Sequence, residues 1–295
     1  MKKLMVTGAL ALLGVVAAVG AAGAGGSVTG VHVAQSSARA LYNVPPMLGK
    51  HVVHLGLGRL KDVTQVNSTN WSGYVDSADT FKAVAGSWTE PTVDCSSSGG
   101  GGGLLGLTGS GGTYSSFWVG LDGYNSNSVE QTGTAADCLG TGQPSYYAWY
   151  EMYPAGEQSL STSQYPVSPG DHLTGIVTSS SANAFTLILT DGTMPNPKWQ
   201  FSIDLSGSNL ARSSAEWVAE APSSCALVFC NGLPLANFGT VSFTGSTALD
   251  TASKWATISG FTDAEVTMQS NGTVKAQPGP LNNSGNGFSV TFDHS

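Results

Sequence analysis

The sequence contains few basic residues and little histidine. Its 295 residues include 11 Lys and Arg against 19 Asp and Glu, with only 5 His. Six of the basic residues lie within the first 61 positions, so the rest of the chain has no cluster of positive charge. Such clusters are what bind nucleic acids and anionic membranes. Neither is therefore expected as a partner, and the net charge of −8 suits a protein that works in acid.

The common signatures of hydrolases and nucleotide-binding proteins are also missing. There is no Gly-x-Ser-x-Gly, no His-Glu-x-x-His, no Asp-Thr/Ser-Gly and no phosphate-binding loop. No Cys-x-x-Cys occurs, and only His172 and His294 follow residue 61, which argues against a metal site. The chemistry that remains is that of carboxylates, amides and aromatic rings, and we expect neither a metal nor a cofactor.

The N-terminus has the features of a signal peptide. Lys2 and Lys3 precede an apolar run of about 16 residues, which is followed by Ala22-Gly23-Ala24, a cleavage site of the A-x-A form. A membrane anchor is the alternative, but a transmembrane helix needs about 20 apolar residues. We therefore expect residues 1–24 to be a signal peptide, and the mature protein to be secreted and free of the membrane.

Charge divides the remaining chain into two parts. The first 61 residues hold six Lys or Arg and no Asp or Glu, hence +6, and the remainder holds 19 acidic and five basic residues, hence −14. A basic segment before an acidic domain predicts a propeptide, residues 25–62, that charge attraction holds on a catalytic domain, residues 63–295. Acid would weaken that attraction by protonating the carboxylates. A basic leader without an inhibitory role is the alternative.

Four cysteines in an exported chain predict two disulfides, with three possible pairings. The short spacing between Cys225 and Cys230 favours a local bridge, which leaves Cys95 to pair with Cys138.

The domain has the pattern of an all-β protein. Short segments rich in Val, Thr, Phe, Tyr and Trp alternate with Gly, Ser, Asn and Pro turns. This pattern predicts a two-sheet antiparallel sandwich of the jelly-roll type. The glycine-rich segment Ser96–Gly112 is expected to be a mobile loop, either beside a site or simply solvated. The predicted strands include Trp71–Val75, Ser116–Leu121, Tyr146–Tyr153, His172–Thr178, Ala184–Thr190, Val241–Phe243 and Gly287–Phe292.

Three segments combine carboxylates, an amide and aromatic rings. Residues two apart on a strand share a face. Trp118 and Asp122 therefore point the same way, and the next strand would bring Gln131 beside them. The same rule groups Trp149 with Glu151 and Tyr153, and Glu216 with Val218 and Glu220.

Each of these residues also has an ordinary structural interpretation. The tryptophans fit a core, the glutamates fit a solvated sheet face, Asp122-Gly123 fits a plain turn, and Gln131 alone carries almost no signal. A mid-strand Glu among Trp and Val is costly if it is buried and unpaired, however, so Glu216 is expected in a cleft or beside a partner.

Taken together, the segments resemble the glutamic peptidases, also called the eqolisin family. They follow one another in the family's order and span about four-fifths of the domain, from about Asn67 to Phe243. The matching segments are Asn70-Trp71-Ser72-Gly73, Trp118-Val119-Gly120-Leu121-Asp122-Gly123, Gln131-Thr132-Gly133, Ala148-Trp149-Tyr150-Glu151-Met152-Tyr153-Pro154, Ala215-Glu216-Trp217-Val218-Ala219-Glu220 and Ala236-Asn237-Phe238-Gly239-Thr240-Val241-Ser242-Phe243.

The resemblance implies a concanavalin-like sandwich, an N-terminal propeptide and an acid endopeptidase that pepstatin does not inhibit. It implies that Gln131 and Glu216 are catalytic. Protein or peptide substrates and the chain's own propeptide are the expected partners, and the protein is expected to be a monomer. The family often has an Asp four residues after the Gln, where this chain has Ala135, with Asp137 as a possible substitute. The cleft-lining positions that it implies are Trp71, Trp118, Asp122 and Glu151, with Glu220 as a nearby carboxylate.

The chemistry of the two residues suits peptide hydrolysis. Glu216 as a carboxylate can take a proton from water and return it to the leaving nitrogen, which predicts an acid optimum. Gln131 can hold the water through its carbonyl and donate an N–H to the developing oxyanion. A jelly-roll glycoside hydrolase that uses Glu151 and Glu216 is one alternative. A non-catalytic carbohydrate-binding sandwich is the other.

Overall fold

The computed structural model describes residues 59–60, 63–96, 111–195, 197–226 and 229–295. The predicted signal peptide, nearly all of the predicted propeptide and most of the glycine-rich segment lie outside these residues. The described chain forms nineteen strands and one 3₁₀ turn, η2 (Ile258–Gly260). No helix in this part of the chain is long and apolar enough to cross a membrane.

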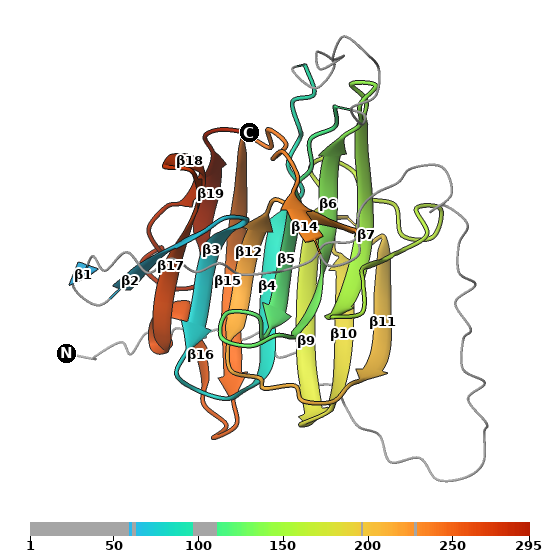
Figure 1. The fold of residues 1–295 in the computed structure, drawn as a ribbon. Coiled ribbons are helices and arrows are strands. Elements are labelled where there is room, and N and C mark those ends of the chain that lie inside the picture. The colour runs from blue at the N-terminus through green and yellow to red at the C-terminus, as the bar shows by residue number, and fades with distance from the viewer. Residues whose placement is uncertain (1–58, 61–62, 97–110, 196, 227–228) are drawn as a thin grey trace, which may run out of the picture. The chain divides into compact units, whose positions relative to one another are not determined.

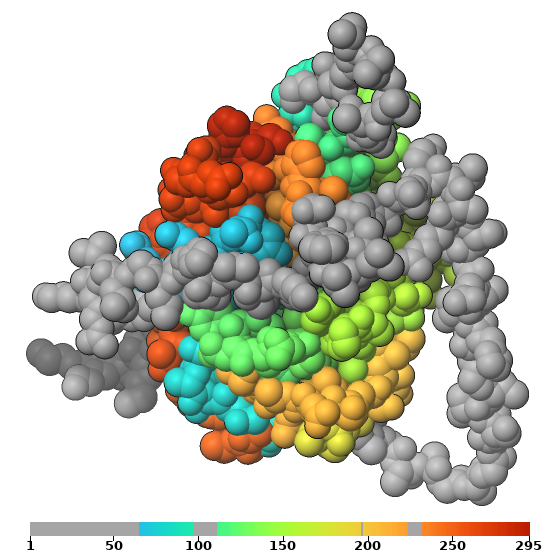
Figure 2. Space-filling model, in the orientation of Figure 1, coloured from blue at the N-terminus to red at the C-terminus, as the bar shows by residue number. Residues whose placement is uncertain are grey.

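The first sheet contains the strands that carry the candidate site residues. Its pairings are antiparallel except for that of β2 with β17, which is parallel. In Figure 2 the early residues in blue therefore lie beside late residues in orange-red, as the pairing of β2 and β3 with β17 requires. In order across the sheet, the strands are β8 (Gln158–Ser159), β7 (Pro144–Tyr153), β6 (Val129–Cys138), β5 (Ser116–Leu121), β12 (Ala215–Glu220), β3 (Trp71–Ser77), β17 (Thr262–Ser270), β2 (Val63–Ser68) and β1 (Arg59–Leu60).

The second sheet packs against the inner face of the first (Figure 1). The pairing of β17 with β18 joins the two sheets into one hydrogen-bonded set of 17 strands, and β13 (Ser223–Ala226) and β14 (Phe229–Gly232) form a separate hairpin. This arrangement confirms the predicted two-sheet sandwich. The strands of the second sheet, in order, are β11 (Trp199–Ser206), β10 (Ala184–Asp191), β9 (His172–Ser181), β4 (Phe81–Thr89), β15 (Thr240–Asp250), β19 (Phe288–Phe292) and β18 (Thr273–Pro278), with β16 (Trp255–Thr257) also paired to β15.

The core between the sheets follows from strand alternation. In β10 every second residue is buried, so Phe185, Leu187 and Leu189 point inward. Burying one such side chain stabilises the fold by roughly 1.5–3 kcal/mol. Trp217 of β12 reaches across and donates its indole N–H to the Ala85 carbonyl at 2.8 Å. Gly86 makes room for it, because a Cβ there would lie 2.6 Å from the Trp217 ring.

The opposite face of the first sheet is also buried. Every residue of β5, β6 and β12 is buried, and a second apolar cluster lies on the side of the sheet away from the inter-sheet core. We call this side the site face. Trp118 and Trp149, for which an ordinary place in the core was the alternative interpretation, belong to it together with Trp71, Val75 and Val218.

The disulfide between Cys95 and Cys138 confirms one of the two predicted bridges. It closes a loop of 43 residues that contains the glycine-rich segment, and cross-linking a loop of that size stabilises a fold by about 4 kcal/mol in the chain-entropy account. Cys225 and Cys230 are cross-strand partners in the β13–β14 hairpin. Their side chains lie outside the described residues, so their bridge stays a prediction.

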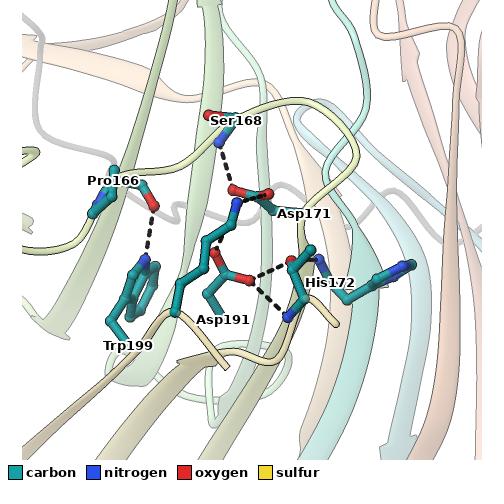
Figure 3. Close-up of polar contacts among 8 residues, drawn as sticks. Pro166, Ser168, Asp171, His172, Asp191 and Trp199 are labelled. Atoms are coloured by element: carbon teal, nitrogen blue, oxygen red, sulfur yellow. Dashed lines mark hydrogen bonds and ion pairs between the residues drawn. The ribbon is translucent and has the colours of Figure 1, made fainter. Parts of the chain in front are cut away.

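A cluster of polar contacts links the turn before β9 to the end of β10 and to the start of β11 (Figure 3). Lys198 pairs with Asp171 and lies 3.6 Å from Asp191. Asp171 in turn accepts the backbone N–H of Ser168 at 2.9 Å, and the indole of Trp199 donates to the Pro166 carbonyl at 2.7 Å. Both carboxylates are buried, so the lysine compensates charges that would otherwise oppose folding.

Candidate active site

The strand register places Gln131 and Glu216 on either side of one glycine. Gly120 of β5 is the cross-strand partner of Gln131 in β6 and of Glu216 in β12. Partners in antiparallel strands point to the same face, so both side chains stand on the site face, separated at their Cα atoms by two strand spacings, roughly 10 Å. Gly120 places no side chain between them, and the Trp118 ring lies close to this position. A Cβ there would lie 3.0 Å from the Trp118 ring and 3.1 Å from the Gln131 Cβ.

Gln131 is buried and held by Glu151. Its Nε2 donates to Glu151 Oε2 at 2.6 Å, and the two residues are cross-strand partners in β6 and β7. This bond orients the amide, so the Gln131 carbonyl oxygen is turned away from Glu151. That oxygen accepts no hydrogen bond from the residues described. Gln131 therefore presents a buried acceptor and one further N–H.

Glu216 is buried with neither carboxyl oxygen accepting a hydrogen bond from the described part of the chain. Burial raises the pKa of Glu216 well above its usual range, with the Ser214 hydroxyl opposing the shift and Asp122 adding to it. A buried polar group without a partner is costly and points to a bound molecule. Glu216 and Gln131 thus offer acceptors for solvent on the same row of the sheet, outside the inter-sheet core.

Further carboxyls surround this row. Glu220 accepts the indole N–H of Trp118 at 2.8 Å and the side-chain amide N–H of Asn70 at 2.8 Å. Burial raises the pKa of Glu220 to about 8. The pKa of Glu151 lies well above its usual range, first because it is buried and then because Glu157 and Glu220 are near. In acid these groups are neutral, so they can share one apolar face.

Two tryptophans form the surface beside the carboxyls. The rings of Trp71 and Trp118 meet edge to face, with centroids 4.7 Å apart. Gly133 lies under Trp118, because a Cβ there would be 2.5 Å from the Trp118 Cβ. Trp118 and Glu220 were expected separately near the site, and the structure joins them by a hydrogen bond. Their contact with substrate stays a prediction.

Asp122 is turned toward the segment that leads into β12. Its carboxylate accepts the backbone N–H groups of Arg212 at 2.7 Å and Ser213 at 2.8 Å, and also the hydroxyls of Ser213 and Ser128. The residue has φ 71, which ends the strand alternation. Asp122 thus holds protein groups close to Glu216, and the predicted contact with substrate stays a prediction.

Asp137 does not take the place of the aspartate that the family often has four residues after the Gln, where this chain has Ala135. It is six residues from Gln131 along β6, or roughly 20 Å, and accepts the Ser115 N–H at 3.2 Å. The carboxyl beside Gln131 is that of Glu151. Sequence reasoning also missed the buried carboxyls of Glu130 and Glu157. A Glu directly before the candidate Gln in a strand was the only signal for the first of these.

The structure is thus a two-sheet sandwich with an amide and a carboxyl on one row of its outer face. The family model of the peptidase A4 family matches residues 69–288. Aspergillopepsin-2 of Aspergillus niger is 32% identical over 216 residues, which cover 65% of this chain and 70% of the relative. The chain belongs to the peptidase A4 family, the eqolisins, and is a glutamic endopeptidase.

Solved structures share the fold. A scytalido-glutamic peptidase bound to a transition state analog inhibitor superposes with a TM-score of 0.62 at 23% identity, covering 76% of this chain and 98% of that one. The aspergilloglutamic peptidase of Aspergillus niger gives 0.52 at 26% identity, covering 61% and 99%. These comparisons confirm the resemblance and the fold class predicted from the sequence.

Proposed function

We propose that this glutamic peptidase cleaves proteins in acid by means of a water molecule held between Gln131 and Glu216. The observation that carries the proposal is the pair of unpartnered buried acceptors, Gln131 Oε1 and the Glu216 carboxyl, which flank the side-chain-free Gly120 on one row of the sheet. A buried water needs two to four polar partners. These groups supply such partners.

The proposed mechanism assigns each group one task. Glu216 takes a proton from the water as it attacks the peptide carbonyl and then returns it to the leaving nitrogen. One N–H of Gln131 is held by Glu151, and the other is free for the developing oxyanion. Glu216 must be ionised to act as a base, and hydrogen bonds from the bound water and substrate favour its ionised form. Glu151 serves to orient the amide.

Acid suits this arrangement. In acid the carboxyls of Glu151 and Glu220 on the site face are protonated, because burial raises the pKa of both. The site face then carries little repulsion between like charges. At higher pH these groups gain charge on the buried site face, which weakens the packing of the site.

We further propose secretion and synthesis as a zymogen. The basic segment before residue 63 and the acidic domain after it support this proposal, since opposite charges favour docking at neutral pH and separation in acid. β2 begins at Val63 and pairs with β17, and Val66 is buried on the site face. Processing just before Val63 would therefore remove only the two-residue strand β1 from the edge of the first sheet. N-terminal sequencing of the protein after acid treatment tests this boundary.

The decisive experiment compares Gln131→Ala with the unchanged protein. We expect acid digestion of casein or haemoglobin between about pH 2 and 5, a window that brackets ordinary carboxyl pKa values, without inhibition by pepstatin, chelators or serine and thiol reagents. Removing one oxyanion donor should lower kcat by about 10²–10³. A glycosidase that used Glu151 and Glu216 would retain most of its activity in this variant. Equal peptidase activity in the two proteins would refute the role of Gln131.

A further inference from the structure

Glu130 is a buried carboxyl that the proposed mechanism does not use. It directly precedes Gln131 in β6, so its side chain points to the opposite side of the sheet. Its cross-strand partners are Leu121 in β5 and Met152 in β7, which are apolar. Its relative exposure is 0%, and neither of its carboxyl oxygens has an N–H or O–H donor in hydrogen-bond geometry among the residues described. A glutamate in this setting needs a partner.

The group that meets Glu130 is another carboxyl, that of Asp122. Asp122 directly follows Leu121, the cross-strand partner of Glu130, and has a positive φ at the end of β5. Its carboxylate accepts the hydroxyl of Ser128, which lies two residues before Glu130, and its charge raises the pKa of Glu130. Two carboxyls can hydrogen-bond to each other only when one of them is protonated, because an ionised carboxylate has no hydrogen to donate. The Ser128 hydroxyl is directed to Asp122 at 3.4 Å, and Arg212 and Glu216 are further charged groups that act on the pair.

Asp122 is tied to three consecutive residues that lead directly to Glu216. It accepts the backbone N–H groups of Arg212 and Ser213, and its own backbone N–H donates to the Ser214 carbonyl at 3.1 Å. Strand β12 begins at the next residue, Ala215, and Glu216 follows. A shift of the Asp122 carboxylate therefore displaces the start of β12, and with it the carboxyl of Glu216.

We propose that Glu130 is a positioning residue: it holds a proton that it shares with Asp122, which thereby keeps the segment 212–214 and Glu216 in place. The inference rests on the proposed role of Glu216. An ionised Glu130 would stand against Asp122 with both charges buried. Arg212 does not neutralise this pair directly, because its Nη1 donates to Ser179 at 3.3 Å and its Nε, which is buried, has no partner among the described residues.

The pKa of Glu130 is shifted in the direction that a bound proton requires. Burial, followed by the charge and hydrogen bond of Asp122, raises the pKa of Glu130 to about 9, with Ser128 and Arg212 opposing the shift. The shared proton is therefore held throughout the acid and neutral range. A folded-state pKa above the unfolded value means that this group favours folding most at low pH, and that the contribution is lost as pH rises toward 9.

The test compares Glu130→Gln with Glu130→Leu. Glutamine has the same shape and can donate an amide N–H to Asp122 at every pH, whereas leucine fills the space without a donor. We expect Glu130→Gln to keep kcat within about threefold in acid, and to lose less thermal stability than the unchanged enzyme between pH 5 and 9. Glu130→Leu should lower kcat by roughly 10- to 100-fold with little change in KM, because a small displacement of a catalytic group has effects of this size. Glu265→Gln, a partly buried glutamate on β17, is the control for activity and should leave kcat unchanged.

Two outcomes would overturn the proposal. If Glu130→Gln loses as much activity as Glu130→Leu, the enzyme needs an ionised Glu130. If Glu130→Leu keeps full kcat, Glu130 does not position Glu216. If the leucine variant does not fold, the thermal stability of Glu130→Gln as a function of pH still tests the proposal. A pH dependence equal to that of the unchanged enzyme would contradict the shared proton. This stability measurement does not depend on Glu216 being catalytic, so it separates failure of this inference from failure of the proposed mechanism.

Discussion

Replacing Gly120 by alanine tests the gap between Gln131 and Glu216. The new methyl carbon would lie 3.0 Å from the Trp118 ring, 3.1 Å from the Gln131 Cβ and 3.2 Å from the Glu130 carbonyl oxygen. Each of these contacts is a few tenths of an ångström too short, so the neighbours must shift. Overpacking of this kind destabilises by about 1–3 kcal/mol, which lowers Tm by roughly 2–12 °C in a domain of 150–250 residues.

The effect on activity should be larger than the effect on stability. The methyl group occupies the space in which the water is proposed to bind, and it presses on Gln131. We expect kcat/KM to fall by roughly 10²-fold, the loss typical of a misplaced catalytic group. The assay is cleavage of a quenched fluorescent peptide at about pH 4, a value near ordinary carboxyl pKa values, with Tm measured in the same buffer.

Gly175→Ala is the matched control. A Cβ there would lie 2.7 Å from Val119 and 3.3 Å from the Trp88 ring, so the strain falls on the inter-sheet core. This variant should lose at least as much stability as Gly120→Ala while its kcat/KM stays near that of the unchanged enzyme. The reasoning would be refuted if Gly120→Ala retained full kcat/KM, or if both variants lost activity in proportion to their loss of stability.

Other consequences can be measured with standard methods. Burial raises the pKa of Glu90 and Glu220 to about 8 and that of Asp76 to about 9, so the native state binds more protons than the unfolded chain between about pH 4 and 9. Tm should accordingly fall as pH rises through this range, and a Tm that rises from pH 4 to 8 would contradict the raised pKa values. Removing the Cys95–Cys138 bridge with the Cys95→Ser/Cys138→Ser double variant should lower the free energy of unfolding by about 2–4 kcal/mol in urea titrations, and an unchanged midpoint would show that the bridge does not restrain the unfolded chain. Trp118→Phe keeps a ring against Trp71 but removes the N–H that Glu220 accepts, so it should cost about 1–3 kcal/mol; the exposed Trp255→Phe should cost almost nothing, and similar values for the two would contradict the importance of this hydrogen bond.

Sequence reasoning predicted the strands well where the side-chain pattern was local. Ser116–Leu121 coincides with β5, and the alternation around Trp149 and Glu151 placed both on one face, as β7 does. It did not predict the parallel pairing of β2 with β17, because no local pattern distinguishes a parallel neighbour from an antiparallel one. The cysteine spacing left three pairings open, and the structure selects Cys95 with Cys138 for one bridge.

Sequence reasoning named the members of the candidate site but not their arrangement. The family resemblance named Gln131 and Glu216, but their placement on either side of Gly120 depends on the register of three strands that are far apart in sequence. The same dependence hid Glu130, which looks like an ordinary strand residue until the end of β5 brings Asp122 to it. Asp122 was expected to contact substrate, and the hydrogen bonds that hold the 212–214 segment became visible only in three dimensions.

A crystal structure of the acid-activated enzyme at about pH 4, at a resolution that shows ordered solvent, tests the central claim most directly. The account predicts one water molecule over Gly120, within hydrogen-bond distance, about 2.6–3.2 Å, of both Gln131 Oε1 and a carboxyl oxygen of Glu216. A site in which no single water contacts both residues, or in which the two side chains bond directly to each other, would contradict it.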